Sequence, residues 1–337
     1  MRRAIALAAG ARAVASPNPW VGAVLESSTG QVFVGATAAP GGLHAEAAAL
    51  HAAGEAARGA TLWSTLEPCA HHGRTPPCVE AVIAAGVRRV VVALADPDPH
   101  VDGRGLRRLR EAGVQVDLGT GADEVRSQLA PYLKHRTTGR PWVVLKLAAS
   151  LDGRTAAPDG SSQWLTGVDA RADAHRLRAE SDAVVVGAGT VRADDPSLTV
   201  RLAEGSDPLR VVLGRAPAGA RVHPALELGG DLGAVLEHLG ALGVVQVLVE
   251  GGPTVAGSFH RSGLVDAYVL YLAPKLLGGD DGLPLFAGPG APTLAAALDG
   301  SITALSRLGP DLRIDLAPRP AASGDDVDAL GASMEPV

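Results

Sequence analysis

Three segments in the first half of the chain carry side chains that can bind a metal ion or move a proton. His44 and Glu46 lie two positions apart at the start of an expected helix, Cys69 follows an expected strand, and Cys78 begins the next expected helix. His44, Cys69 and Cys78 provide three zinc ligands and leave the fourth tetrahedral position for water. Zinc lowers the pKa of bound water toward neutrality, so hydroxide becomes available at pH 7. Glu46 can take the proton of that water and pass it to a leaving amine.

The order of these residues, His-x-Glu followed by Pro-Cys and a second Cys, is the arrangement of the zinc nucleobase deaminases. Taken singly, the histidine is typical of a helix surface and the cysteines of buried free thiols. A closed structural zinc site with His71 or His72 as the fourth ligand is a further alternative, but it gives Glu46 no role. We therefore predict an open zinc site, in which Glu46 carries the proton and is not a ligand.

The composition limits the class of protein. A chain of 337 residues corresponds to two domains at roughly 150 residues each. The net charge of −6 opposes broad electrostatic binding to duplex nucleic acid. No apolar run reaches the ~18 residues of a membrane span, and two cysteines are too few for a disulfide scaffold. The basic, Ala-rich N-terminal segment is interpreted as a first helix and not as a signal peptide. We expect a cytoplasmic protein.

The first half alternates helices with strands, which is typical of a layered α/β sheet. After the first helix, apolar runs predict strands at 21–26, 31–37, 60–66, 88–96 and from 114. Helices are expected at 44–58, from 78 to Gly86, and at 103–113. Residues 135–142 have no periodicity and contain Gly and Pro, so we place a linker there. The first domain is therefore expected to span 1–138.

The second half repeats the alternation. Strands are expected at 143–150, 182–189, 209–214, 246–252 and 267–276, with helices at 168–180, near 231–242 and up to about 263. Two terminal strands, 302–308 and 312–317, can pair as a hairpin across Gly309 and Pro310. This domain is expected to span 142–318. Residues 319–337 are rich in Pro, Ala, Ser and Asp and are expected to form a disordered tail.

Several motifs in the same order resemble those of the riboflavin-biosynthesis bifunctional deaminase/reductase family. Generic deaminases space their cysteines as Cys-x-x-Cys, whereas here the eight residues AHHGRTPP intervene, as in this family. The resemblance covers about residues 4–318. Its motifs are SPNPWVGAV, HAE, TLEPCAHHGRTPPC, DPDPHVDGRG, KLAASLDGRTA, SSQWLTG, VGAGTVRADDPSLTVR, VEGGPT and LAPKLLGG.

The resemblance implies an α/β protein with a cytidine-deaminase-like three-layer N-terminal domain and a dihydrofolate-reductase-like C-terminal domain. It implies zinc-dependent hydrolytic deamination of 2,5-diamino-6-(5-phosphoribosylamino)pyrimidin-4-one. NADPH-dependent reduction of the ribosyl arm to ribityl would follow. The resemblance thus implies a small phosphorylated pyrimidine as the partner. The charge and the apolar runs described above lead us to expect neither nucleic acid nor a membrane, and we also expect a homo-oligomer.

In the first domain, the resemblance places four substrate-binding residues. Asn18 lies in a Pro-flanked turn, where its amide can contact the pyrimidine edge, although an Asx turn is the ordinary explanation. His71 and Arg74 lie between the cysteines and can hold a phosphate, or they belong to a solvated loop. Asp96 follows a strand and can bind ribose hydroxyls. Asp98 departs from the family, which has an amide-like residue there.

In the second domain, the resemblance implies two sets of residues around a nicotinamide nucleotide. The nucleotide would contact Ala148, Trp164, Thr190, Asp194 and the 252–258 loop, that is Gly252, Pro253, Thr254, Val255, Ala256, Gly257 and Ser258. The substrate would contact Ser162, Arg178, Leu198, Arg201 and Glu250. Arginines suit a phosphate partner, although Arg178 lies in an Arg-rich helix and solvation is the alternative.

Four further features of the second half bear on the reductase. The run VVVGAGTVRA fails the dinucleotide fingerprint because Arg192 stands where the third glycine is needed. The Gly pair before Pro253 is by itself explained by a tight strand-to-helix turn, but the resemblance favours a pyrophosphate site at this helix start. Lys146 lies in an apolar strand, where a lysine needs a partner or a role, so we predict that it is catalytic; snorkelling at the sheet end is the alternative. Arg215 follows a strand and is a candidate for the 2′-phosphate of NADPH.

Two other functions are compatible with parts of the sequence. A nucleic-acid or free-nucleoside deaminase joined to an unrelated reductase is opposed by the acidic net charge and by the phosphate-type loop. A non-catalytic, zinc-stabilised binding protein requires His44 and Glu46 to be idle. Metal analysis combined with an ammonia-release assay separates these possibilities.

Overall fold

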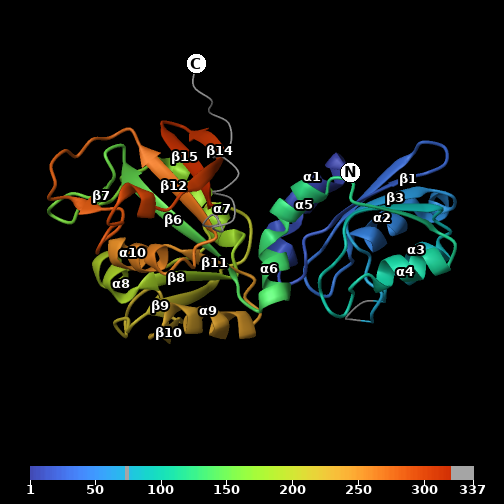
Figure 1. The fold of residues 1–337 in the computed structure, drawn as a ribbon, viewed down its shortest axis with the longest axis horizontal. Coiled ribbons are helices and arrows are strands. Elements are labelled where there is room, and N and C mark those ends of the chain that lie inside the picture. The colour runs from blue at the N-terminus through green and yellow to red at the C-terminus, as the bar shows by residue number, and fades with distance from the viewer. Residues whose placement is uncertain (73–75, 320–337) are drawn as a thin grey trace, which may run out of the picture. The chain divides into compact units, whose positions relative to one another are not determined.

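The computed structural model describes residues 1–72 and 76–319 (Figure 1). Contacts between residues divide the chain into two compact units. One contains Met1–Val143 and Arg171–Val249, and the other contains Val144–Ala170 and the chain from Glu250 onward. This division differs from the sequence-based boundary near residue 140, because it assigns strands of the second sheet to both units.

The first half forms a five-stranded sheet in the order β2-β1-β3-β4-β5. Its strands are β1 Gly22–Glu26, β2 Val32–Ala36, β3 Thr61–Leu66, β4 Arg89–Leu94 and β5 Gln115–Leu118. β1 pairs antiparallel with β2 and β3, whereas β3, β4 and β5 run parallel. All five predicted strands of this half are confirmed.

Small residues allow helices of the first half to approach the sheet closely. They are α1 Arg2–Ala15, α2 Ala45–Ala53, α3 Cys78–Ala84, α4 Arg104–Glu111, α5 Ala122–Gln128 and α6 Ala130–Thr138, with a 3-10 turn at Gly54–Ala57. α1 buries an alanine face at positions 4, 8, 11 and 15, the spacing of one side of a helix. A Cβ added to Gly22 would lie 1.9 Å from the carbonyl oxygen of Ala4. The predicted first helix is therefore confirmed and is packed against β1.

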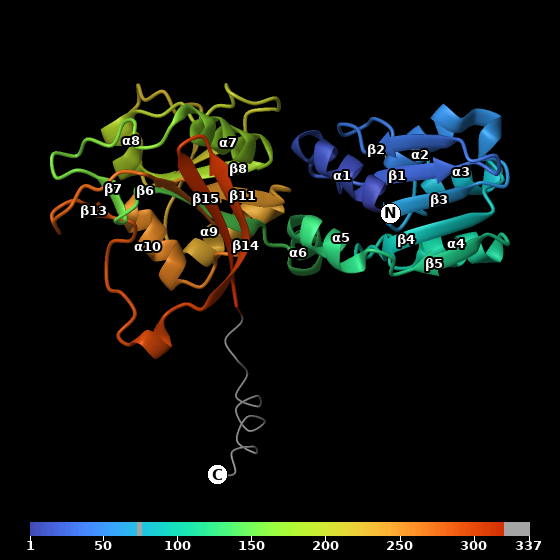
Figure 2. The same cartoon turned by 90° about the horizontal axis from the view of Figure 1, so that it is seen from above.

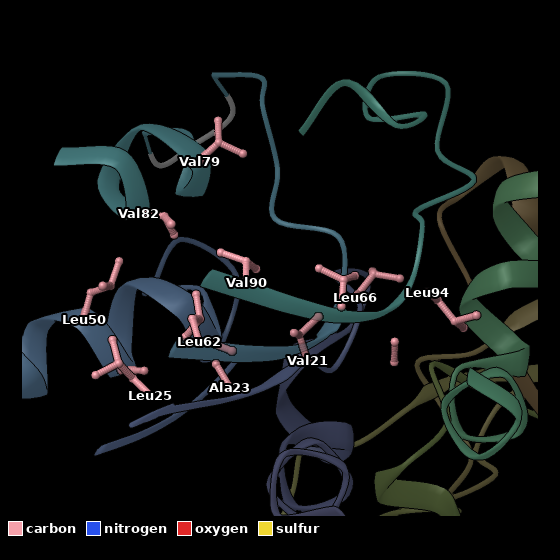
Figure 3. Close-up of a cluster of buried hydrophobic side chains, with 14 of the residues drawn as sticks. Val21, Ala23, Leu25, Leu50, Leu62, Leu66, Val79, Val82, Val90 and Leu94 are labelled. Carbon is pink, nitrogen blue, oxygen red and sulfur yellow. The ribbon is translucent and has the colours of Figure 1, made fainter. Parts of the chain in front are cut away.

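The core of this half is made of Val, Leu and Ala, as the low aromatic content predicts (Figure 3). Leu25, Leu62 and Val90 come from three neighbouring strands and are fully buried. Leu50 from α2 and Val82 from α3 pack against them. Each such side chain contributes about 1.5–3 kcal/mol when fully buried. This core fixes the ends of β3, α2 and α3, where the predicted metal ligands lie.

The predicted linker at 135–142 is largely wrong. α6 continues to Thr138 and β6 begins at Trp142, so only residues 139–141 connect them. Pro131 lies in the first turn of α6, where its missing N–H costs no hydrogen bond. Gly139 ends the helix with a φ of 71°, a conformation that glycine adopts without steric cost.

The second half forms an eight-stranded sheet in the order β10-β9-β8-β11-β6-β12-β15-β14. Its strands are β6 Trp142–Ser150, β8 Ala183–Gly187, β9 Leu209–Leu213, β10 Leu226–Leu228, β11 Gln246–Val249, β12 Ala267–Ala273, β14 Gly300–Leu308 and β15 Asp311–Pro318. β7 Arg154–Ala156 and β13 Leu283–Pro284 form a small separate sheet. The helices are α7 Val168–Ala179, α8 Ala188–Asp194, α9 Leu232–Ala241 and α10 Pro253–Arg261, with a 3-10 turn at Leu294–Ala296.

The end of the described chain is the predicted hairpin. β14 and β15 pair antiparallel, and Figure 2 shows them in red. Arg319, expected to begin a disordered tail, instead bonds to Asp299 through its backbone N–H and its guanidinium. The rest of that expected tail, 320–337, lies outside the described residues. Among the helices that are described, none is long and apolar enough to cross a membrane.

Candidate active sites

The three predicted metal ligands lie at the ends of three elements of the first half. His44 is the residue before α2, Cys69 follows β3, and Cys78 is the first residue of α3. The Nδ1 atom of His44 lies 3.5 Å from Sγ of Cys69 and 3.3 Å from Sγ of Cys78. One ligand atom from each of the three residues falls within 4.8 Å of the others. The structure therefore brings together three donors that are up to 34 positions apart in sequence.

The electrostatics of this cluster favour a thiolate. The pKa of Cys69 is lowered to about 4, first by a hydrogen bond from the Cys78 thiol and then by one from His44. The backbone N–H of Cys78, at the N-terminus of α3, also donates to Sγ of Cys69 at 3.4 Å. The pKa of Cys78 is raised, because its proton is held by Cys69 and its side chain is buried.

One imidazole and two sulfurs at these separations fit a zinc ion with three protein ligands. Among the residues that the structure describes, neither His71 nor His72 joins the donor cluster. His71 is exposed and instead faces His100, with 6.1 Å between the ring centroids. The closed structural site considered above therefore lacks a fourth ligand from either histidine.

Glu46 lies in the first turn of α2 and is only 3% exposed. The hydroxyl of Ser64 donates to its Oε1 atom at 3.1 Å. Burial raises the pKa of Glu46, and the nearby Cys69 thiolate raises it further. A carboxyl group in these surroundings holds a proton more readily than one in water, which is what a proton carrier requires.

A pocket opens beside the donor cluster. His44, Glu46 and Cys69 line one part of it, and predicted substrate residues line other parts. These are Asn18, His71 and Asp96. Arg74, which was predicted to hold the phosphate with His71, lies outside the described residues.

Asp96 is the buried acceptor of this pocket. The hydroxyl of Tyr132 lies 3.2 and 3.1 Å from its two carboxylate oxygens. The backbone N–H of Asp98 donates to Asp96 at 2.9 Å. Burial raises the pKa of Asp96 to about 6 despite these hydrogen bonds. Its charge therefore changes close to neutral pH.

Asp98, the departure from the family pattern, interacts with His100 and Arg136. Its Oδ1 atom accepts from the backbone N–H of His100 at 2.8 Å and lies 2.8 Å from Nδ1 of that imidazole. Its Oδ2 atom lies 3.5 Å from Nε of Arg136. Burial by itself would raise the pKa of Asp98, but the His100 bonds and the Arg136 charge together lower it. The additional carboxylate thus stays ionised beside a cation.

Three residues that shape this pocket were missed by the sequence reasoning. Tyr132 and Arg136 both lie in α6, and Arg136 falls inside the predicted linker. Glu67 accepts four backbone N–H groups, from Asp96 and positions 103, 105 and 106. It thereby ties the loop after β4 to the end of β3. Glu67 stands in the Glu-Pro-Cys motif, so its position in that motif was the available signal.

In the second half, the structure places Lys146 beside Glu250. Lys146 lies in β6, and Glu250 directly follows β11, the neighbouring strand. Nζ of Lys146 is 3.6 Å from Oε2 of Glu250, and the two side chains are 19% and 7% exposed. Lys146 therefore has a specific carboxylate partner, which does not support simple snorkelling.

The other predicted nucleotide and substrate residues near these strands have varied surroundings. Ala148 is half-buried in β6, and Ser162 is half-buried after β7. Trp164 is 65% exposed, and its carbonyl accepts from Nζ of Lys275 at 2.9 Å. Gly252 precedes α10, so residues 253–258 form the first turns of that helix. The expected strand, glycine pair and helix start are thus confirmed as local structure.

The remaining predicted reductase residues lie on or after α7 and α8. Thr190 and Asp194 belong to α8, a helix that was not among those predicted from the sequence. Arg178 donates to the Thr199 carbonyl at 3.2 Å, and the guanidinium of Arg201 donates to the Thr199 hydroxyl at 2.5 Å. Arg178 and Arg201, the two arginines predicted to bind phosphate, therefore both contact Thr199. In the same segment, Leu198 is buried with a φ of 53°, and beyond it Arg215 is exposed after β9.

Family profiles match both halves of the chain. Residues 141–312 match the RibD C-terminal domain, and residues 1–94 match the cytidine and deoxycytidylate deaminase zinc-binding region. The chain is 40% identical to the riboflavin biosynthesis protein RibD of Escherichia coli K12, covering 94% of this chain and 98% of that protein. It is 45% identical to the RibD protein of Mycobacterium tuberculosis H37Rv, with 90% and 92% covered.

Solved structures agree with these sequence matches. Acinetobacter baumannii RibD superposes with a TM-score of 0.88 at 38% identity, covering 95% of this chain and 98% of that one. A Thermotoga maritima protein superposes with a TM-score of 0.85 at 32% identity, covering 95% and 97%. That protein is described as a diaminohydroxyphosphoribosylaminopyrimidine deaminase/5-amino-6-(5-phosphoribosylamino)uracil reductase. The expected fold class, a cytidine-deaminase-like domain followed by a reductase domain, is confirmed.

Proposed function

Because the chain belongs to the RibD family of riboflavin-biosynthesis enzymes, which unite a pyrimidine deaminase with a reductase, we propose that it performs both reactions on one phosphorylated pyrimidine. The substrate is 2,5-diamino-6-(5-phosphoribosylamino)pyrimidin-4-one. Water replaces an exocyclic amine, which leaves as ammonia. Hydride delivery at C1′ then reduces the ribosyl arm to ribityl, giving 5-amino-6-(5-phosphoribitylamino)uracil. We place the deaminase in residues 1–138 and the reductase in residues 142–318.

The deaminase proposal depends most on one observation, the buried Glu46 beside three metal donors at the wall of an open pocket. His44, Cys69 and Cys78 would hold the zinc ion, which supplies water with a pKa near neutrality when bound. Glu46 takes a proton at its carboxylate and gives it to the departing amine. Ser64 keeps the carboxylate in one orientation through the hydrogen bond to Oε1.

The polar residues elsewhere in the pocket would orient the phosphoribosylamino arm and the ring. Asn18 presents an amide to the pyrimidine edge, and Asp96 accepts from ribose hydroxyls. His71, exposed at the same pocket, contacts the phosphate together with Arg74. These contacts hold the exocyclic amine close to Glu46, and such orientation accounts for much of an enzyme's rate enhancement.

For the reductase, the proposed cofactor is NADPH, which supplies the hydride when bound. The N-terminus of α10 would hold its pyrophosphate, because the start of a helix favours an anion. Ala148, Trp164, Thr190 and Asp194 would contact the nucleotide, and Arg215 its 2′-phosphate. Lys146, with Glu250, would hold substrate hydroxyls and support proton transfer as the ribose opens. Ser162, Arg178, Leu198 and Arg201 would complete the substrate site.

We also propose that the chain forms homo-oligomers. β14 is the last strand of the eight-stranded sheet, and most of its residues are exposed. Ile302 and Leu305 on this strand are each 65% exposed. An exposed apolar edge strand favours pairing with another chain.

Zinc analysis combined with an ammonia-release assay tests the proposed deaminase. The purified protein should contain one zinc ion and release ammonia from the diaminopyrimidine substrate. Cys78→Ser should lose metal and deamination together while the domain remains folded, because its apolar core does not depend on zinc. Unfolding of this half upon chelation would instead show a structural zinc site.

A further inference from the structure

Tyr271 in β12 is a buried aromatic residue that the proposed reductase mechanism does not use. It is 1% exposed and is among the largest fully buried side chains of the described chain. The centroid of its ring lies 5.8 Å from Nζ of Lys146. This separation is within the range at which an ammonium group is attracted to the face of an aromatic ring.

The strand register explains why these two side chains meet. β12 runs parallel to β6, with Val269 opposite Lys146 and Tyr271 opposite Ala148. Side chains alternate between the faces of a sheet, so Lys146, Ala148 and Tyr271 share one face. Lys146 and Tyr271 are therefore diagonal neighbours, a relation in which long and aromatic side chains reach one another.

Lys146 thus has a partner from each neighbouring strand. Glu250 follows β11 on one side, and Tyr271 comes from β12 on the other. A lysine side chain has four rotatable bonds and loses much rotamer freedom when it is held in place. A carboxylate on one side and a ring face on the other limit where the ammonium group can lie.

We propose that Tyr271 is a positioning residue of the reductase site, whose ring face holds the Lys146 ammonium group where the ribose arm is reduced. This inference rests on the proposed catalytic role of Lys146. The ring, and not the phenol hydroxyl, performs this task. The Tyr271→Phe protein should therefore catalyse reduction of the ribose arm with a kcat within about 3-fold of the wild-type value. Tyr271→Leu removes the ring face and should lower the reductase kcat about 10-fold. The KM for NADPH should change little, because the nucleotide phosphates are assigned to the start of α10.

A double-mutant cycle with Lys146→Ala separates positioning from a general packing effect. Lys146→Ala alone should lower reduction at least ~100-fold, while ammonia release continues and the deaminated, unreduced intermediate accumulates. If Tyr271 acts through Lys146, adding Tyr271→Leu to Lys146→Ala should cost no more than about 3-fold further. If the two losses multiply, Tyr271 acts independently of the lysine and the inference is overturned.

The same set of variants distinguishes failure of this inference from failure of the proposed function. Full turnover by a folded Lys146→Ala protein would overturn the catalytic assignment of Lys146. If Lys146→Ala loses reduction but Tyr271→Leu keeps the wild-type kcat of reduction, only the role of Tyr271 is overturned. Should Tyr271→Leu not fold, Tyr271→Met offers a flexible side chain without a ring face and is expected to show the same loss.

Tyr268 provides a matched control in the same strand. It is 4% exposed, lies three positions from Tyr271 on the opposite face, and contacts Nδ1 of His260 at 2.9 Å. Tyr268→Leu removes an equal ring from β12 without touching Lys146 and should keep the reductase kcat within about 3-fold. An equal loss of kcat in the folded Tyr268→Leu and Tyr271→Leu proteins would show that ring removal weakens the strand in general, and would contradict the positioning role.

Discussion

Glu46 lines the pocket with His44 and Cys69, and its carboxyl group also lies beside Cys78. The nitrogen and sulfur atoms of His44, Cys69 and Cys78 contact one another, whereas Glu46 accepts from the hydroxyl of Ser64 and also has a side-chain hydrogen bond with Cys78. The carboxylate is not a member of the donor cluster. We therefore assign it to proton transfer.

Replacing Glu46 by Gln tests this assignment. Glu46→Gln keeps the size of the side chain but removes its ability to carry a proton. We expect zinc content to stay at the wild-type level and deamination to fall at least ~10²-fold, the usual contribution of general acid–base catalysis. Reduction of substrate that is already deaminated should continue. Loss of zinc on this substitution would show that Glu46 is a ligand.

Asp96 predicts a specific pH dependence, because its pKa is raised to about 6 in the folded protein. Below that pH the carboxylate is protonated and accepts ribose hydroxyls less well, so the KM of deamination should rise between pH 7 and pH 5. Asp96→Asn should have a higher KM at pH 7 and should lack this part of the pH dependence. The substrate phosphate also titrates near pH 6. Subtracting the pH profile of KM for Asp96→Asn from that of the wild-type protein removes this contribution. Identical profiles for both proteins would contradict the assigned role.

The same shift has a consequence for stability. The pKa of Asp96 is 3.8 in the unfolded chain and about 6 in the folded protein. At a pH below 3.8 this carboxyl group contributes its full stabilisation, and the contribution is lost as the pH rises through about 6. Two pKa units correspond to about 3 kcal/mol. Between pH 4 and pH 7, the free energy of unfolding of the wild-type protein should therefore decline relative to that of Asp96→Asn.

At the level of elements, the metal site depends on how closely α2 packs on β2. A Cβ added to Gly35 of β2 would lie 2.1 Å from the carbonyl oxygen of Ala45 and 2.6 Å from the backbone nitrogen of Ala49. Both contacts are with the backbone of α2, so the helix itself would have to move. His44 and Glu46, at the start of α2, would move with it.

We therefore expect Gly35→Ala to cost about 1–3 kcal/mol of unfolding free energy and to weaken zinc binding. Thermal unfolding and metal content measure the two effects. Gly10→Ala in α1 is the control, since nothing lies within 4 Å of its added Cβ. It should be neutral or stabilise by up to ~1 kcal/mol. Wild-type stability and zinc content in Gly35→Ala would contradict the close packing.

Element positions were predictable where hydrophobic periodicity is strong. Val-rich runs such as the one ending at Leu94 and the strand around Lys146 were placed within two residues of their observed ends. α5 was missed because only Val125 of its seven residues is buried, which leaves no pattern to detect. α6 was partly assigned to a linker because its last turn is polar.

The zinc ligands were predictable because each lies in a short local motif. The Lys146–Glu250 pair was not predictable as a contact, because the two residues are separated by 104 positions and the strand order β11-β6-β12 does not follow the sequence. For the same reason, the contact between Tyr132 and Asp96 could not be inferred from spacing. Periodicity identifies strands, but pairing across a sheet is set by tertiary packing.

At the scale of the whole molecule, the exposed edge strand β14 predicts self-association. Replacing Ile302 and Leu305 together by Lys adds charge to this edge, which natural proteins use to prevent pairing. We expect the wild-type protein to be oligomeric by light scattering and the double variant to dissociate more readily. Leu294→Lys, at a residue that is 93% exposed outside the sheets, is the control. An unchanged mass for the double variant would show that β14 is not the interface.

The central claim is that one chain deaminates and then reduces the same phosphorylated pyrimidine. The most direct test supplies the purified zinc-containing protein with 2,5-diamino-6-(5-phosphoribosylamino)pyrimidin-4-one, with and without NADPH, and identifies the products by mass spectrometry. Without NADPH, we predict only the product in which oxygen has replaced one exocyclic amine, with ammonia released in equal amount. With NADPH, that product should gain two hydrogens. Reduction without prior deamination, or no ammonia release from a zinc-loaded protein, would contradict the claim.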